Sequence, residues 1–153
     1  MQHCNKKADA IARIWGGSGA PQLSGCVQFY QEKECVLIVA RVSGLPQDSE
    51  TGFFGLHIHE GSSCFGAEFP ETGSHYSPAG LVHPKHAGDL PPLLMCQVNA
   101  YLSFKTDRFT VKEILGRTIV IHSYPDDFQS QPSGNAGRKI ACGIIQKDCS
   151  ASN

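Results

Sequence analysis

Short apolar runs, most of them rich in β-branched residues, recur along the chain and are separated by clusters of glycine, proline, serine and aspartate. This punctuation is typical of an all-β domain rather than of a helical one. The runs predict strands over residues 10–15, 26–30, 35–42, 55–59, 99–104, 117–122 and 140–145. Only 108–115 has a weakly helical pattern, and 31–34 is predicted to be a polar hairpin turn.

Two segments between the predicted strands, 60–92 and 123–137, are unusually long. Loops of this length without regular structure tend to be functional. The first contains five prolines between residues 70 and 92. It also contains four residues of types that bind metals: His75, His83, His86 and Asp89. We expect a bound metal to hold this loop in shape.

The histidines form a pattern that predicts two metal sites. His57 and His59 lie in the predicted strand 55–59, where alternate residues project to the same face, so both imidazoles point one way. In the long loop, three imidazoles and one carboxylate make a complete tetrahedral zinc set, closed as in structural zinc sites. His57, His59 and His122 remain, and three imidazoles with an open position suit copper, because nitrogen ligands accept both Cu(II) and Cu(I). The alternative is a surface scatter of histidines, but only His3 lies outside the pattern.

Length and charge narrow the class of protein. A chain of 153 residues fits a single domain spanning 1–153. The 13 Lys and Arg nearly balance the 14 Asp and Glu, and no run of five like charges occurs, so we expect no nucleic-acid partner. The longest apolar stretch, 35–40, is far shorter than the roughly 20 residues of a membrane-spanning helix, so we expect no membrane partner.

The N-terminal residues bear on localisation. Polar and charged residues follow Met1 as far as Asp9, with no basic-then-apolar leader, and this favours the cytoplasm. If a leader has been removed, the seven cysteines would suit a secreted or periplasmic protein.

Six motifs resemble the copper-zinc superoxide dismutase family, and the resemblance extends over about residues 9–147. They are GLHIHE at 55–60, GSHYSP at 73–78, HAGDL at 86–90, GRTIVIH at 116–122, GNAG at 134–137 and ACG at 141–143. The run GDLPPL at 88–93 and the short loop after His122 are more similar to bacterial members. The resemblance implies an immunoglobulin-like Greek-key fold, a flattened eight-stranded β-barrel with two long functional loops.

The resemblance also implies a metal assignment and an activity. The copper ligands would be His57, His59, His75 and His122, and the zinc ligands His75, His83, His86 and Asp89. His75 would bridge the two metals, and Asp126 would bond the outer nitrogens of His57 and His83. The implied reaction converts superoxide to oxygen and hydrogen peroxide by Cu(II)/Cu(I) cycling, with zinc in a structural role.

Superoxide is an anion, so a cation near the copper site should steer and hold it. The family has an arginine three residues before the C-terminal cysteine, and here that position, counted back from Cys142, is Lys139. Lysine keeps the charge but lacks the planar fork of arginine, so we expect a working but slower enzyme. A one-residue bulge that places Arg138 in the channel would restore the family's arrangement.

The resemblance implies a disulfide between Cys64 and Cys142, which would tie the long loop to the barrel. The family's first and last strands are neighbours, so a second disulfide between Cys4 and Cys149 is a further hypothesis. Three other cysteines lie in or beside apolar runs and are predicted to be buried thiols: Cys26, Cys35 and Cys96.

Two other functions compete with this interpretation. A copper-handling relative would keep the fold without catalysis, but such relatives often lack a copper ligand and none is missing here. A zinc hydrolase needs an open zinc position, whereas the predicted zinc set is closed. A homodimer and a monomer both fit the sequence.

Overall fold

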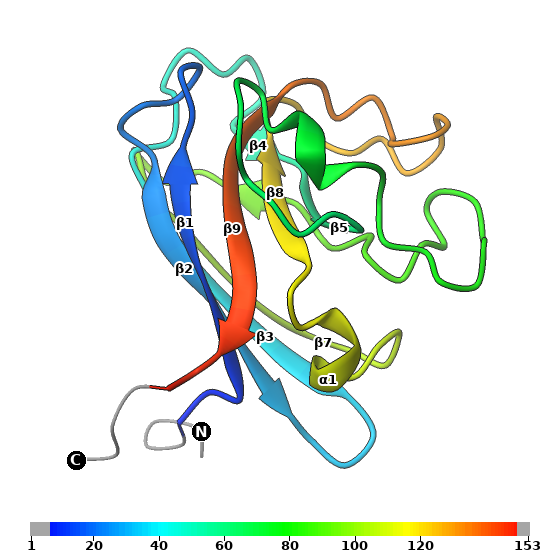
Figure 1. Ribbon diagram of the computed structural model, residues 1–153. Coiled ribbons are helices and arrows are strands. Elements are labelled where there is room, and N and C mark those ends of the chain that lie inside the picture. Colours follow the sequence, from blue (N-terminus) through cyan, green and yellow to red (C-terminus); the bar gives the residue numbers. More distant parts are fainter. Residues whose placement is uncertain (1–6, 150–153) are drawn as a thin grey trace.

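The computed structural model describes residues 7–149, and its fold is nearly all-β, as the sequence predicts (Figure 1). The strands are β1 (Ala10–Gly16), β2 (Ser24–Gln31), β3 (Val36–Ser43), β4 (Phe53–Phe54), β5 (Leu56–His59), β6 (Leu93–Leu94), β7 (Ala100–Thr106), β8 (Thr118–His122) and β9 (Lys139–Lys147). The helix α1 (Val111–Ile114) lies within the weakly helical segment, and a 3-10 helix, Pro70–Thr72, lies in the first long loop. No helix in the described part of the chain is long and apolar enough to cross a membrane. Gly55 alone separates β4 from β5, and counting these two as one strand gives the eight strands of the family.

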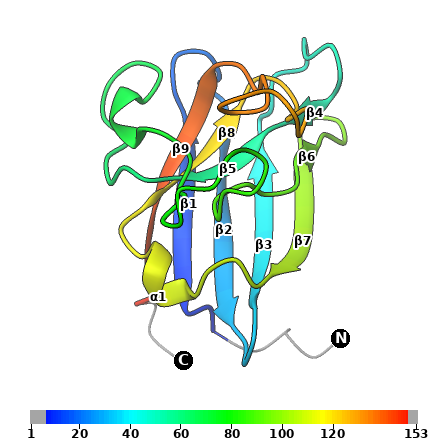
Figure 2. The ribbon, with the colours of Figure 1, turned by 90° about the vertical axis from the view of Figure 1, so that its right-hand side faces the viewer.

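Seven strands form one antiparallel sheet in the order β5-β8-β9-β1-β2-β3-β7, which curls into a half-barrel (Figure 2). The remaining strands, β4 and β6, pair with each other. The chain crosses from β3 to β5 at the opposite edge of the sheet, and β9 returns to lie beside β1, as in a Greek key. The first and last strands are therefore neighbours, with Ala10 opposite Lys147.

The strands β5 and β8 differ from the other strands because every residue in them is buried. One face, with Ile58 and Ile121, joins the barrel core. Because side chains alternate along a strand, the other face carries His57, His59 and His122. The two long loops cover this face, so the histidines are enclosed between the sheet and the loops.

A disulfide between Cys64 and Cys142 ties the first long loop to β9, as the family resemblance implies. Beside it, Phe69 of the loop packs against Val120 of β8. The loop is thus fixed to β8, which carries part of the enclosed face, and to the neighbouring strand β9. The second disulfide stays a prediction, because Cys4 lies outside the described residues.

The prediction of buried thiols is wrong for Cys96, which is exposed. It begins the turn between β6 and β7, where its main chain exchanges two hydrogen bonds with Asn99. Cys26 and Cys35 are half-buried. The apolar run 93–96 ends at this turn, and the turn leaves the Cys96 side chain in solvent.

Candidate metal centre

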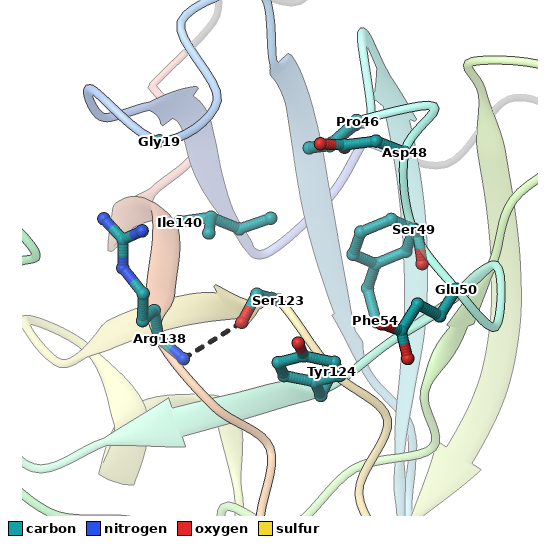
Figure 3. Close-up of a pocket in the computed structure, with 10 residues that line it drawn as sticks. All are labelled: Gly19, Pro46, Asp48, Ser49, Glu50, Phe54, Ser123, Tyr124, Arg138 and Ile140. Atoms are coloured by element: carbon teal, nitrogen blue, oxygen red, sulfur yellow. Dashed lines mark hydrogen bonds between the residues drawn. The ribbon is translucent and has the colours of Figure 1, made fainter.

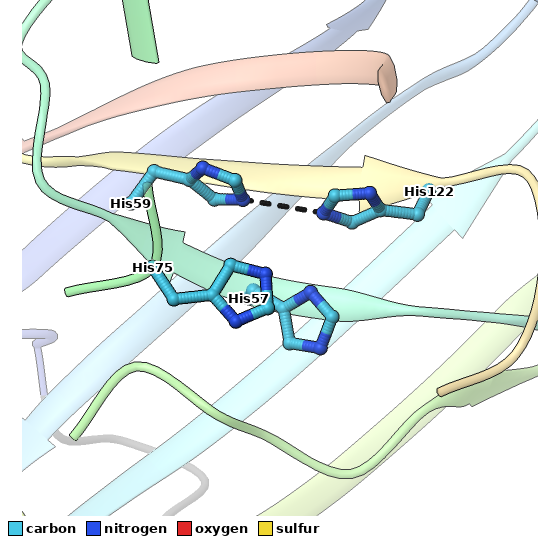
Figure 4. A group of neighbouring side chains, drawn as sticks. All are labelled: His57, His59, His75 and His122. Atoms are coloured by element: carbon cyan, nitrogen blue, oxygen red, sulfur yellow. Dashed lines mark hydrogen bonds between the residues drawn. The ribbon is translucent and has the colours of Figure 1, made fainter. Parts of the chain in front are cut away.

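Four histidines, which we call the strand-side group, gather over β5 and β8 (Figure 4): His57, His59, His75 and His122. His57 and His59 come from β5, and His122 ends the neighbouring strand β8. His75 lies in the first long loop and forms an isolated antiparallel β-bridge with His59 of β5. One nitrogen of each ring lies within 4.8 Å of the others. Nε2 of His59 is 3.2 Å from Nε2 of His122.

A second set of side chains, the loop-side group, comes entirely from the first long loop: His75, His83, His86 and Asp89. Nδ1 of His86 lies 3.4 Å from Nδ1 of His75 and 3.2 Å from Oδ2 of Asp89. Nδ1 of His83 lies 3.1 Å from the same carboxylate oxygen. A tetrahedral zinc ion with bonds of about 2.0–2.1 Å separates its ligand atoms by about 3.3 Å. The donor atoms of this group therefore fit four-coordinate zinc.

His75 belongs to both groups. Its Nδ1 lies 2.7 Å from Oδ1 of Asp89 on the loop side. Its Nε2 is buried and has no hydrogen-bond partner, and the His57 ring lies 3.9 Å away between centroids. A buried polar atom without a partner is costly, and a metal ion in the strand-side group would remove that cost.

Asp126, in the second long loop, links the two groups through the outer nitrogens of two histidines. Its carboxylate accepts hydrogen bonds from Nε2 of His57 at 2.7 Å and Nε2 of His83 at 2.8 Å. It also accepts the main-chain N–H of Phe128 at 2.7 Å. Because Nε2 of each ring donates to the carboxylate, Nδ1 carries no proton, and both Nδ1 atoms are buried without a hydrogen-bond partner. Those are the atoms that each ring presents to its group.

Main-chain carbonyls fix the other two strand-side rings. Nδ1 of His59 donates to the Gly73 carbonyl at 2.9 Å, and Nδ1 of His122 donates to the Gly137 carbonyl at 3.3 Å. Nε2 of each ring is then left unprotonated and directed at its neighbours. All the strand-side rings thus offer a lone pair to the centre of the group.

Burial lowers the pKa of His57, His59 and His122, that of His122 to about 3. The rings are therefore neutral at neutral pH, which is the form that binds a metal ion. Burial acts to raise the pKa of Asp89 and of Asp126, but hydrogen bonds from neighbouring histidines, and for Asp126 also from the Phe128 main chain, outweigh it and lower both pKa values. Both carboxylates therefore stay ionised.

Lys139 lies in a cavity of about 280 Å³ that it lines together with His59, His75 and His122. The sheet register is irregular between Ile121 and His122 and leaves Lys139 opposite His122. The ammonium donates to the Thr72 hydroxyl at 2.7 Å, to the Gly73 carbonyl at 3.1 Å and to the Phe69 carbonyl at 3.5 Å. Burial lowers the pKa of Lys139.

Arg138 lies elsewhere. Its guanidinium pairs with the Glu68 carboxylate through Nη2 at 2.6 Å and Nε at 2.8 Å. It lines a separate cavity of about 270 Å³, in which its main-chain N–H donates to the Ser123 hydroxyl (Figure 3). The register irregularity therefore does not bring Arg138 to the histidines.

Two side chains at the loop-side group have no signal in the sequence. Arg108, after β7, donates to three main-chain carbonyls of the first long loop. Gln131, in the second long loop, exchanges two hydrogen bonds with the main chain of His83. Neither residue belongs to a motif or a periodic pattern. Many residue types can bond a main-chain carbonyl or N–H, so such contacts leave no mark in the sequence.

Comparison with known proteins identifies the family. Residues 23–145 match the family model of copper/zinc superoxide dismutase. The chain is 34% identical over 140 residues to superoxide dismutase [Cu-Zn] 2 of Aquifex aeolicus, covering 82% of this chain and 80% of that relative. It is 34% identical over 160 residues to superoxide dismutase [Cu-Zn] 3 of Arabidopsis thaliana, covering 93% and 92%. It is also 32% identical over 137 residues to the extracellular superoxide dismutase [Cu-Zn] of Rattus norvegicus, covering 82% and 55%. The chain belongs to the copper/zinc superoxide dismutase family.

Proposed function

We propose that the protein converts superoxide to oxygen and hydrogen peroxide with copper in the strand-side group and zinc in the loop-side group. The placement of His75 carries the proposal, because its two nitrogens serve different groups and Nε2 has no protein partner. The copper ligands would be His57, His59, His75 and His122, and the zinc ligands His75, His83, His86 and Asp89. The one-electron chemistry, oxygen from one superoxide and peroxide from a second, is what Cu(II)/Cu(I) cycling supplies when copper is bound.

The protein's own contribution at the strand-side group is to fix tautomers. Asp126 holds the proton of His57 on Nε2, and carbonyl oxygens hold those of His59 and His122 on Nδ1. Each ring therefore keeps one nitrogen free of protons at neutral pH. Because the outer nitrogens are held by acceptors, the rings do not need to turn when a metal binds.

His75 Nε2 is the atom at which we place the transferable proton. His75 lines the same cavity as Lys139, so a proton from solvent can reach the ring. Nε2 would pass one proton to the peroxide product and solvent would supply the second, while Nδ1 stays with the loop-side group. The loop-side group is closed by its four donors, which supports a structural role for zinc.

We assign the steering of superoxide to Lys139 rather than Arg138. The ammonium lies in the cavity with three of the strand-side rings, whereas the guanidinium of Arg138 is paired with Glu68 outside it. A positive charge at the mouth of a site raises the arrival rate of a small anion, and salt weakens this effect. Lys139 thus provides the charge that draws the substrate toward the histidines.

Metal analysis and superoxide decay after pulse radiolysis test the proposal. We expect about one copper and one zinc per chain after loading, with decay that stops when copper is chelated and returns when copper is restored. His122→Gln should lose copper and activity but keep zinc, whereas His3→Gln should keep both. A protein that holds zinc alone and stays inactive after copper loading would contradict the proposal.

A further inference from the structure

The turn formed by residues 83–89, which we call the ligand turn, supplies three of the four loop-side donors: His83, His86 and Asp89. It belongs to no strand or helix, and main-chain hydrogen bonds tie only its C-terminal end to the rest of the fold, through Gly88 to Ile58 and Tyr76. Side chains from two later segments of the chain also bond its main chain, one between β7 and α1 and one in the second long loop.

Arg108 reaches the ligand turn from the segment between β7 and α1. Its Nη1 lies 3.0 Å from the Pro84 carbonyl oxygen, 3.1 Å from that of His86 and 3.5 Å from that of Asp89. One nitrogen therefore gathers three carbonyls of the turn around itself. A guanidinium suits this task because it stays charged and its donors have a fixed geometry.

Gln131 reaches the ligand turn from the second long loop. Its Oε1 accepts the main-chain N–H of His83 at 3.1 Å, and its Nε2 donates to the His83 carbonyl at 2.6 Å. The amide thus pairs with the His83 main chain as a strand would, through one donor and one acceptor. With Asp126 on the ring of His83, the second long loop fixes both the main chain and the side chain of this residue.

These contacts leave the donor atoms free. Arg108 bonds Asp89 through its carbonyl, and the Asp89 carboxylate faces His75, His83 and His86. A cation on the carboxylate itself would compete with a metal ion for the same lone pairs. Main-chain contacts avoid that competition while still limiting where the donors can lie.

We infer that Arg108 and Gln131 are positioning residues that hold the ligand turn in its zinc-binding shape. The inference rests on the proposed function, which places zinc in the loop-side group. Partners that orient metal ligands from outside typically change metal affinity by about 10- to 100-fold when they are removed. Each residue should therefore raise the affinity for zinc without touching the ion.

Zinc affinity in the full-length protein, measured by competition with a chromophoric chelator, tests the inference. Arg108→Met and Gln131→Met keep unbranched side chains but remove the hydrogen bonds. Each should weaken zinc binding by about 10-fold or more. The matched controls are Arg13→Met on β1 and Gln129→Met in the second long loop, which should bind zinc as the unmodified protein does.

Two further measurements separate positioning from general stability. Cobalt(II) in place of zinc reports the ligand geometry through its visible absorption, which should weaken and shift in both variants but not in the controls. The melting temperature of the metal-free protein should stay close to that of the unmodified protein, although zinc affinity falls. A fall in melting temperature with unchanged zinc affinity and an unchanged cobalt spectrum would overturn the inference. If the unmodified protein itself binds no zinc, the loop-side assignment of the proposed function fails instead.

Discussion

The two ligand groups share His75 but are built in different ways. In the strand-side group, His57, His59 and His122 stand on paired strands, and the register of β5 and β8 sets their spacing. In the loop-side group, Arg108 and Gln131 bond the main chain of the ligand turn, one end of the turn bonds β5 through Gly88, and the disulfide fixes the loop to β9. The sheet thus places the strand-side group, whereas separate contacts made by a loop place most of the loop-side group.

Removing the disulfide should affect the loop-side group far more than the strand-side group. The disulfide fixes the first long loop, whereas the register of the strands does not depend on it. The bond between Cys64 and Cys142 spans 78 residues, for which chain entropy predicts a stabilisation of about 4.5 kcal/mol. We expect the double replacement by alanine to lower the free energy of unfolding by about that amount, as measured by urea denaturation. Limited proteolysis should then cut within 60–92 first. Cys96→Ala is the control, and an equal loss there would contradict the prediction.

Gly134→Ala should break the link between the groups at Asp126. Gly134 has φ +69°, and a Cβ there would collide with Oδ1 of Asp126 and Nε2 of His83. Strain and the displaced hydrogen bond should together cost about 3 kcal/mol and weaken zinc binding. Gly116 also has a positive φ, of +81°, but open space around its Cβ position, so Gly116→Ala isolates the backbone strain. Equal losses of stability in the two variants would mean that the collision with Asp126 has no effect.

The same contrast explains what could be predicted from the sequence. The spacing of His57 and His59 follows from strand alternation, and the structure places both on one face. The contacts of Arg108 and Gln131 left no pattern, because a main-chain carbonyl or N–H can be reached by many residue types from many places. Cys96 was wrongly predicted to be buried because the apolar run continues into a tight turn.

Acid should destabilise the strand-side group in the metal-free protein. His122 has a pKa of about 3 when folded against 6.5 ordinarily, and the pKa values of His57 and His59 are lowered in the same direction. Between pH 3 and pH 6.5 the unfolded chain binds more protons than the folded one. The free energy of unfolding therefore falls as the pH drops from 6.5 toward 3. Each such ring adds up to about 1.4 kcal/mol per pH unit. Urea midpoints against pH should show a shallower slope for His122→Gln, and identical slopes would exclude its contribution.

The smallest effect concerns Lys139, where the strands and the loop meet. An ammonium has three N–H donors, and here three acceptors of the loop take them, at Phe69, Thr72 and Gly73. Holding superoxide would require one of these bonds to be given up. A guanidinium has five donors and can serve the loop and an anion together. We therefore expect Lys139→Arg to be a few-fold faster at low salt.

Superoxide decay in copper- and zinc-loaded protein measures this difference. Lys139→Glu should be slower by about 10-fold, and the differences among the three proteins should shrink as salt is added, because salt screens the approach of the anion. Arg138→Gln, outside the cavity, should leave the rate unchanged. Equal rates for lysine, arginine and glutamate at position 139 would remove this side chain from the path of the substrate. The charge that draws superoxide would then have to come from elsewhere on the two loops.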